Sequence, residues 1–118
     1  MKTIFIVEDD KGIRDALQLL LSFEDYEVRS FSDAETFKQR DKSVVPDVFM
    51  LDVMLPDGLG TDLCNDLKKE SQTSAIPVMI MSAHAKAHTV IDSCNADEFV
   101  VKPFDIDDVL LKIESLLS

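Results

Sequence analysis

The chain of 118 residues is long enough for one domain with a hydrophobic core and too short for two. A hydrophobic content of 46%, with only three glycines and four prolines, indicates a folded globule and excludes a disordered or fibrous chain. The formal charge of −11 argues against binding nucleic acid or an anionic membrane surface, because both polyanions would be repelled.

Two further features of the composition bear on the compartment. No segment has the length or apolarity of a signal-peptide core or a membrane span, so the sequence predicts a cytoplasmic protein. Cys64 and Cys94 are far apart and lack metal-ligand spacing, which indicates two buried thiols in a reducing compartment.

The first half of the chain alternates apolar segments with patterns of helical period. Thr3 to Val7 predicts a strand, and Asp10 is placed as the N-cap of the helix that follows. A strand over Glu27 to Phe31, a weaker helix over Asp33 to Gln39 and a strand over Asp47 to Leu51 come next. The first helix is indicated by an apolar stripe of Ile13, Leu17, Leu20 and Leu21.

The second half continues the alternation after a turn at Pro56, Asp57 and Gly58. Asp57 and Asp62 are expected at the start of a third helix, where the helix dipole favours anions. Strands are predicted over Ile76 to Met81 and Glu98 to Val101, and Asp105 is placed as the N-cap of the last helix. The apolar stripes of these three helices are Leu59, Leu63 and Leu67, then Ala87, Val90, Ile91 and Cys94, then Ile106, Val109, Leu110, Ile113 and Leu117.

Five strands alternating with five helices predict an α/β fold: a five-stranded parallel sheet with helices on both faces. In such flavodoxin-like, doubly wound sheets the ligand site lies beyond the carboxyl ends of the strands, where the strand order reverses. For the order 2-1-3-4-5 that point lies between the first and third strands.

Three acids are predicted to meet at that point. Glu8 and Asp9 follow the first strand, and Asp52 ends the third. Three carboxylates so close together require a cation, because otherwise at least one pKa would rise strongly. Two candidates for this cation are Mg²⁺, which prefers oxygen ligands, and Lys102, which follows the fifth strand and precedes Pro103.

The same rim carries the groups that phosphoryl transfer needs. Ser82 follows the fourth strand, so that its hydroxyl and the Lys102 ammonium would both be available to phosphate oxygens. Asp52 is then left as the nucleophile, since a carboxylate near a cation stays ionised and can accept a phosphoryl group.

Four motifs in order, "IFIVEDD", "DVFMLDVMLPDGLG", "VMIMSA" and "ADEFVVKPF", resemble the receiver domains of two-component response regulators along the whole chain. The resemblance implies a single receiver domain over residues 1–118, with Asp52 as phosphoacceptor, Lys102 as the phosphate-binding lysine and a cis bond to Pro103. It implies that Glu8, Asp9, Asp52 and the backbone carbonyl of Met54 hold Mg²⁺, with Ser82 and Phe99 as the switch pair.

The sequence departs from the family pattern at two places. Phe99 stands where tyrosine is common, so its movement would be sensed by packing without a hydroxyl. The stretch from Ser82 to Lys102 is shorter than usual, and Asn95 replaces a usual glycine. Asparagine tolerates the left-handed conformation that ends a helix, so the fourth helix can still end there.

The function that the resemblance implies is phosphoryl transfer to Asp52 from a phosphohistidine on a sensor histidine kinase or histidine phosphotransfer protein. The domain would catalyse its own Mg²⁺-dependent phosphorylation and dephosphorylation, but act mainly as a switch for an unidentified output partner. A phosphatase is disfavoured because Met54 stands where its acid would be, and an acidic first loop disfavours a flavodoxin. A non-phosphorylated pseudo-receiver remains the alternative.

Overall fold

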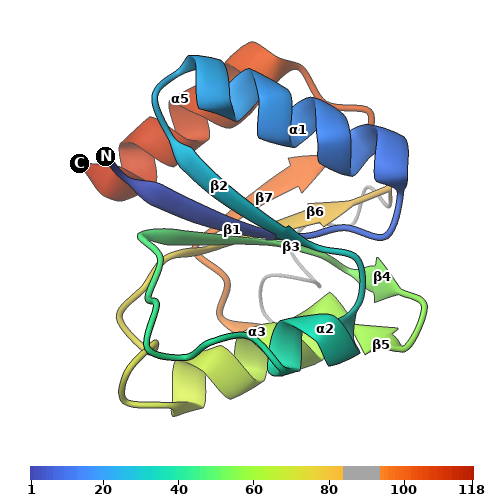
Figure 1. Ribbon diagram of the computed structural model, residues 1–118, viewed down its shortest axis with the longest axis vertical. Coiled ribbons are helices and arrows are strands. Elements are labelled where there is room, and N and C mark those ends of the chain that lie inside the picture. Colours follow the sequence, from blue (N-terminus) through green and yellow to red (C-terminus); the bar gives the residue numbers. More distant parts are fainter. Residues whose placement is uncertain (84–93) are drawn as a thin grey trace.

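The middle layer of the protein is a parallel β-sheet (Figure 1). In the computed structural model, which describes residues 1–83 and 94–118, its strands lie in the order β2-β1-β3-β6-β7. Every neighbouring pair is parallel, and β6 and β7 are the fourth and fifth strands of this sheet along the chain, so the predicted order 2-1-3-4-5 is confirmed. The strands are β1 (Thr3–Val7), β2 (Glu27–Phe31), β3 (Val48–Asp52), β6 (Val78–Ser82) and β7 (Glu98–Val101).

Helices cover both faces of the sheet, as predicted. On one face lie α1 (Lys11–Phe23) and α5 (Ile106–Leu117), and on the other lie α2 (Ala34–Lys38) and α3 (Gly60–Lys69) (Figure 1). The predicted fourth helix, with Ala87, Val90 and Ile91, lies outside the described residues. Asn95, expected to replace a glycine, has a positive φ of 55°. Among the described helices none is long and apolar enough to cross a bilayer.

Predicted N-caps begin two of these helices. The Asp10 carboxylate accepts a hydrogen bond from the backbone N–H of Ile13 at 3.0 Å. The Asp105 carboxylate accepts one from the backbone N–H of Asp107 at 2.9 Å. Each cap satisfies an N–H that has no partner within its own helix, and so determines the residue at which the helix begins.

The core consists of two layers, because side chains alternate between the faces of each strand. In β1, Ile4 and Ile6 pack with α1 and α5, whereas Phe5 and Val7 pack with α2 and α3. All four side chains are buried, and burying one such side chain contributes about 1.5–3 kcal/mol. Strands with both faces covered explain why the apolar runs in the sequence are nearly continuous.

A short hairpin, which sequence analysis did not predict, follows β3. It consists of β4 (Met54–Leu55) and β5 (Gly58–Leu59), paired antiparallel. Asp57 lies in its turn and accepts hydrogen bonds from the backbone N–H groups of Ala34, at 2.8 Å, and Glu35, at 2.9 Å. Its predicted place at the start of the third helix is therefore wrong: this carboxylate satisfies the N-terminus of α2 instead. Asp62 does lie in the first turn of α3.

Candidate functional site

Three carboxylates from two neighbouring strands meet at the edge of the sheet. Val7 of β1 lies beside Leu51 of β3, so the residues that follow them emerge together. Oxygen atoms of Glu8, Asp9 and Asp52 all lie within 4.8 Å of one another. The predicted convergence of these acids, from positions 44 and 43 residues apart along the chain, is what the register of β1 and β3 produces.

The three acids differ in their exposure. Glu8 is completely buried, Asp52 is 6% exposed and Asp9 is exposed to solvent. Two unit charges ~4 Å apart repel by roughly 4 kcal/mol at an effective dielectric constant of about 20. With three such pairs, the cluster needs positive charge beside it.

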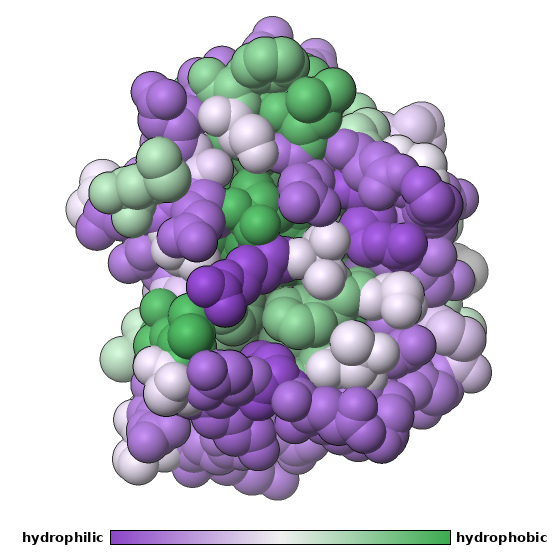
Figure 2. Space-filling model, viewed as in Figure 1, coloured by the Kyte–Doolittle hydropathy of each residue, from purple (hydrophilic) through white to green (hydrophobic). Residues whose placement is uncertain are grey.

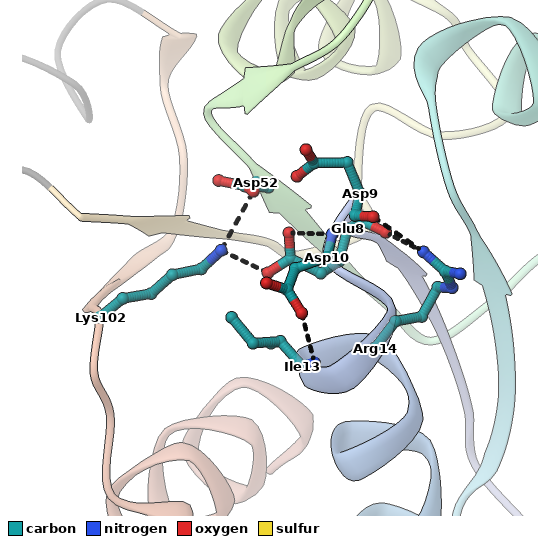
Figure 3. Close-up of polar contacts among 7 residues, drawn as sticks. All are labelled: Glu8, Asp9, Asp10, Ile13, Arg14, Asp52 and Lys102. Atoms are coloured by element: carbon teal, nitrogen blue, oxygen red, sulfur yellow. Dashed lines mark hydrogen bonds and ion pairs between the residues drawn. The ribbon is translucent and has the colours of Figure 1, made fainter.

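Lys102 supplies part of this charge from the end of β7 (Figure 3). Its Nζ donates hydrogen bonds to Glu8 Oε1 and, at 3.0 Å, to Asp52 Oδ2. Its backbone N–H donates to the Ser82 carbonyl at 2.7 Å, and the Lys102–Pro103 peptide bond is cis, the isomer that the resemblance implied. The ammonium thus joins the ends of β1 and β3 through a side chain that is itself only 15% exposed.

The environment shifts two pKa values in this cluster. Burial, and then the neighbouring Asp52, raise the pKa of Glu8 to about 7. Burial alone would lower the pKa of Lys102, but its hydrogen bonds to Glu8 and Asp52 raise that pKa above its ordinary value. Lys102 therefore stays protonated at neutral pH, and one ammonium faces three carboxyl groups, of which Glu8 is the one whose pKa is raised.

A cavity of about 300 Å³ opens over these groups. Its walls include Met54 and the buried Ser82, in addition to Lys102 and the acids. Of the predicted site residues, only Phe99 and Pro103 are not part of the wall. Phe99 is 5% exposed and packs in the core layer under α3, so the structure places it behind the site and not on its rim. The wall comprises Glu8, Asp9, Asp10, Ile13, Asp52, Met54, Ser82, Ala83 and Lys102.

The donor atoms in this cavity fit a hard divalent cation. They are carboxylate oxygens from three side chains, with no sulfur or imidazole ligand among the described residues of the cluster. Mg²⁺ binds through one or two carboxylates and keeps several waters, for which an open cavity of this size leaves room. The cluster Glu8, Asp9 and Asp52 could therefore hold Mg²⁺.

Sequence reasoning missed one residue beside the site. Arg14, on the first helix, donates from Nη1 to the backbone carbonyls of Glu8, at 2.7 Å, and Asp9, at 3.3 Å (Figure 3). The available signal was an arginine near the N-terminus of a helix, where the helix dipole disfavours a cation.

Comparisons with known proteins agree with this geometry. The family model of the response regulator receiver domain matches residues 4–114. The DNA-binding dual master transcriptional regulator RpaA of Synechocystis sp. is 31% identical over 99% of this chain, which covers 49% of RpaA. The chain spans about half the length of the curated relatives it matches first.

Two solved structures have the same fold. TrrA from Thermotoga maritima, in complex with Mg²⁺ and BeF, superposes with a TM-score of 0.87 at 27% identity and covers 99% of this chain and 100% of its own. The non-phosphorylated HemR receiver domain from Leptospira biflexa has a TM-score of 0.88 at 28% identity, covering 100% of this chain and 95% of its own. The sheet order, the acidic rim and the family match together show that this chain belongs to the response regulator receiver domains.

Proposed function

We propose that Asp52 accepts a phosphoryl group and that its phosphorylation switches the conformation of the domain. The observation that carries this proposal is the setting of its carboxylate: nearly buried, at the wall of an open cavity, with the Lys102 ammonium 3.0 Å away. A carboxylate in that setting can be reached by a donor and has a cation beside it for the phosphate oxygens.

Phosphoryl transfer to Asp52 exchanges one bond to phosphorus for another and needs no oxidant, reductant or further phosphate donor. A carboxylate oxygen of Asp52 forms a bond to phosphorus while the bond from phosphorus to the donor's imidazole nitrogen breaks, and the imidazole leaves with that electron pair and takes up a proton. Lys102 holds a phosphoryl oxygen as a point charge, and the Ser82 hydroxyl donates a hydrogen bond to another. Later attack by water on phosphorus releases phosphate and restores the carboxylate.

We propose Mg²⁺ as the cofactor, held by Asp9, Asp52 and the Met54 carbonyl directly and by Glu8 through water. Bound there, it would neutralise charge on the phosphoryl oxygens. The oxygen-only donor set supports this assignment, as does the description of TrrA in complex with Mg²⁺ and BeF. Glu8 already bonds Lys102, which is consistent with an indirect role.

The switch we propose couples Ser82 to Phe99. Ser82 ends β6 and pairs in register with Val101 of β7, two residues after Phe99. Movement of Ser82 toward the new phosphate oxygens would change the space beside β7, and Phe99 would repack in response. Residues 1–118 act in this proposal as one cytoplasmic receiver unit that signals to an output partner.

The phosphodonor we propose is a sensor histidine kinase or a histidine phosphotransfer protein. An apolar groove of about 280 Å³ adjoins the site, shares Ile13 and Lys102 with its wall and continues along α1 through Ala16 and Leu20. Apolar side chains lie over α1 and α5 at the top of Figure 2, and further apolar patches lie in the middle and at the lower left of this face, between hydrophilic side chains. A protein that brings phosphohistidine to Asp52 must rest on this rim.

The groove makes the donor testable. Leu20→Glu should slow transfer from a phosphorylated histidine phosphotransfer protein at least about tenfold. The reason is that burying a carboxylate in an apolar contact weakens the binding free energy of the two proteins by roughly 1.4 kcal/mol or more. Phosphorylation by phosphoramidate, a small donor, should be unchanged. Leu111→Glu, on the exposed side of α5 and outside the groove, is the matched control. Equal slowing by both variants would contradict the assignment.

Phosphorylation itself is tested by mass. With Mg²⁺ and phosphoramidate the protein should gain one phosphoryl group, and Asp52→Asn should not. If the unaltered protein gains no phosphate from phosphoramidate, acetyl phosphate or a phosphorylated histidine protein, the pseudo-receiver alternative replaces this proposal.

A further inference from the structure

The turn that carries the acidic pair is tied to α1 by one side chain. Arg14 donates from the same nitrogen, Nη1, to the carbonyl oxygens of Glu8 at 2.7 Å and Asp9 at 3.3 Å. Figure 3 shows the guanidinium on the backbone side of this turn, opposite Lys102, which bonds the carboxylates. The turn is thus held from both sides, by Lys102 through side chains and by Arg14 through the backbone.

The position of Arg14 is unfavourable for the stability of its own helix. The first turn of α1 has no acidic residue and begins with Lys11 and Gly12, whereas α5 has Asp107 and Asp108 in its first turn. A cation near a helix N-terminus opposes the helix dipole by about 0.3–1 kcal/mol. The charge-assisted bonds to the two carbonyls are what offset this cost.

We propose that Arg14 is a positioning residue for the acidic pair: its bonds to the Glu8 and Asp9 carbonyls hold the Asp9 carboxylate at the cavity and so tighten Mg²⁺ binding. The inference rests on the metal site proposed above. Asp9 is exposed, and the other bonds to its turn are made by its neighbours: the Glu8 N–H donates to the Phe31 carbonyl at 3.0 Å, Lys102 bonds the Glu8 carboxylate, and Asp10 caps the helix and donates a long 3.4 Å bond to Glu8. Without Arg14 the Asp9 carboxylate would have to be ordered when the metal binds.

The positive charge of Arg14 and its proposed positioning role predict opposite changes in Mg²⁺ affinity when Arg14 is removed. Arg14 is a cation beside a cation site, so by electrostatics alone its removal should strengthen Mg²⁺ binding. If its bonds position Asp9, removal should weaken binding although the site becomes more negative. The sign of the change therefore separates the two roles, and a loss of fold stability alone would not weaken the binding by folded protein.

The test compares Mg²⁺ dissociation constants by calorimetry for the unaltered protein, Arg14→Gln, Arg14→Lys and Lys11→Gln. Lys11→Gln is the matched control, since Lys11 is on the same turn of α1 and bonds Asp15, not the acidic turn. We expect Arg14→Gln to bind Mg²⁺ roughly tenfold more weakly, the lower end of the range for a group that orients a metal ligand. Arg14→Lys should bind at an intermediate strength and Lys11→Gln no more weakly than the unaltered protein.

Each outcome decides the matter. If Arg14→Gln binds Mg²⁺ as tightly as Lys11→Gln, the positioning role is overturned while the metal site stands. If the unaltered protein binds no Mg²⁺, both proposals fall. Should Arg14→Gln not fold in a thermal scan, Arg14→Lys carries the comparison, and affinity equal to that of the unaltered protein overturns the role. Faster amide exchange at Asp9 and Asp10 in Arg14→Gln is the second expected signature.

Discussion

Gly60 lies unusually close to the backbone of Asp52, the proposed phosphoacceptor. A β-carbon on Gly60 would lie 1.9 Å from the carbonyl oxygen of Asp52 and 2.8 Å from its carbonyl carbon. Both of these atoms belong to the backbone of Asp52, so neither can move alone. Gly60 cannot easily move away either, because its N–H donates a hydrogen bond to the Val53 carbonyl at 2.8 Å. Any side chain at position 60 therefore requires the backbone around Asp52 to shift.

Gly60→Ala should lower the free energy of unfolding by about 1–3 kcal/mol, the usual cost of overpacking, and slow phosphorylation of Asp52 by phosphoramidate. Chemical denaturation and intact-protein mass measure the two effects. Gly58→Ala is the control, because its β-carbon would make an ordinary 3.8 Å contact with Ala34 Cβ. Equal effects of the two substitutions would show that the contact with Asp52 is not the cause.

The burial of the two cysteines predicts how readily their thiols react. Both are buried, and burial, followed by the nearby Cys94, raises the pKa of Cys64 to about 12. The Cys64 thiol therefore remains protonated at pH 8, where alkylating reagents need the thiolate. Iodoacetamide should modify Cys64 in guanidinium chloride and leave it unmodified in native protein; rapid native labelling, seen by peptide mass, would contradict this burial.

Among the elements, α2 depends on a residue outside itself. It is a helix of five residues, too short to be stable alone, and its first two N–H groups bond to Asp57 in the turn between β4 and β5. The hairpin that follows Asp52 is thereby attached to α2.

Asp57→Ala should lower the free energy of unfolding by about 1–2 kcal/mol, as the loss of a helix cap does, and increase amide exchange at Ala34 and Glu35. Asp62→Ala is the control: it removes an exposed acid from the first turn of α3, where the dipole interaction is worth only about 0.3–1 kcal/mol. An equal loss in both variants would contradict a specific role for Asp57.

On the scale of the whole molecule, the charge of −11 opposes the compact state. Sodium chloride should raise the midpoint of thermal unfolding modestly by screening, and Mg²⁺ at equal ionic strength should raise it further. At ten times its dissociation constant, Mg²⁺ adds about 1.4 kcal/mol, or roughly 5 °C for a domain of this size. Asp9→Ala should abolish the excess and keep the salt effect; an unchanged response to Mg²⁺ would refute Asp9 as a ligand.

Much of this molecule follows from local pattern. The alternation in Ile4, Phe5 and Ile6 and the stripes of α1 and α5 predict most of the buried side chains, because each element has a fixed period. Leu20 of the α1 stripe is an exception, since its side chain is exposed. Asp10 and Asp105 were predicted as caps because a cap lies next to the helix it begins. Asp57 was misplaced because its helix lies 22 and 23 residues earlier in the chain.

The convergence of acids was also within reach of the sequence, since the carboxyl ends of parallel strands share one edge, and the order of the strands places Glu8 beside Asp52. Only the tertiary structure decided how that rim is held: Lys102 on Glu8 and Asp52, and Arg14 on the carbonyls behind them. Periodicity determines the face on which a side chain lies. The direction of a hydrogen bond depends on where a distant segment comes to rest, and that is known only after the layers have packed.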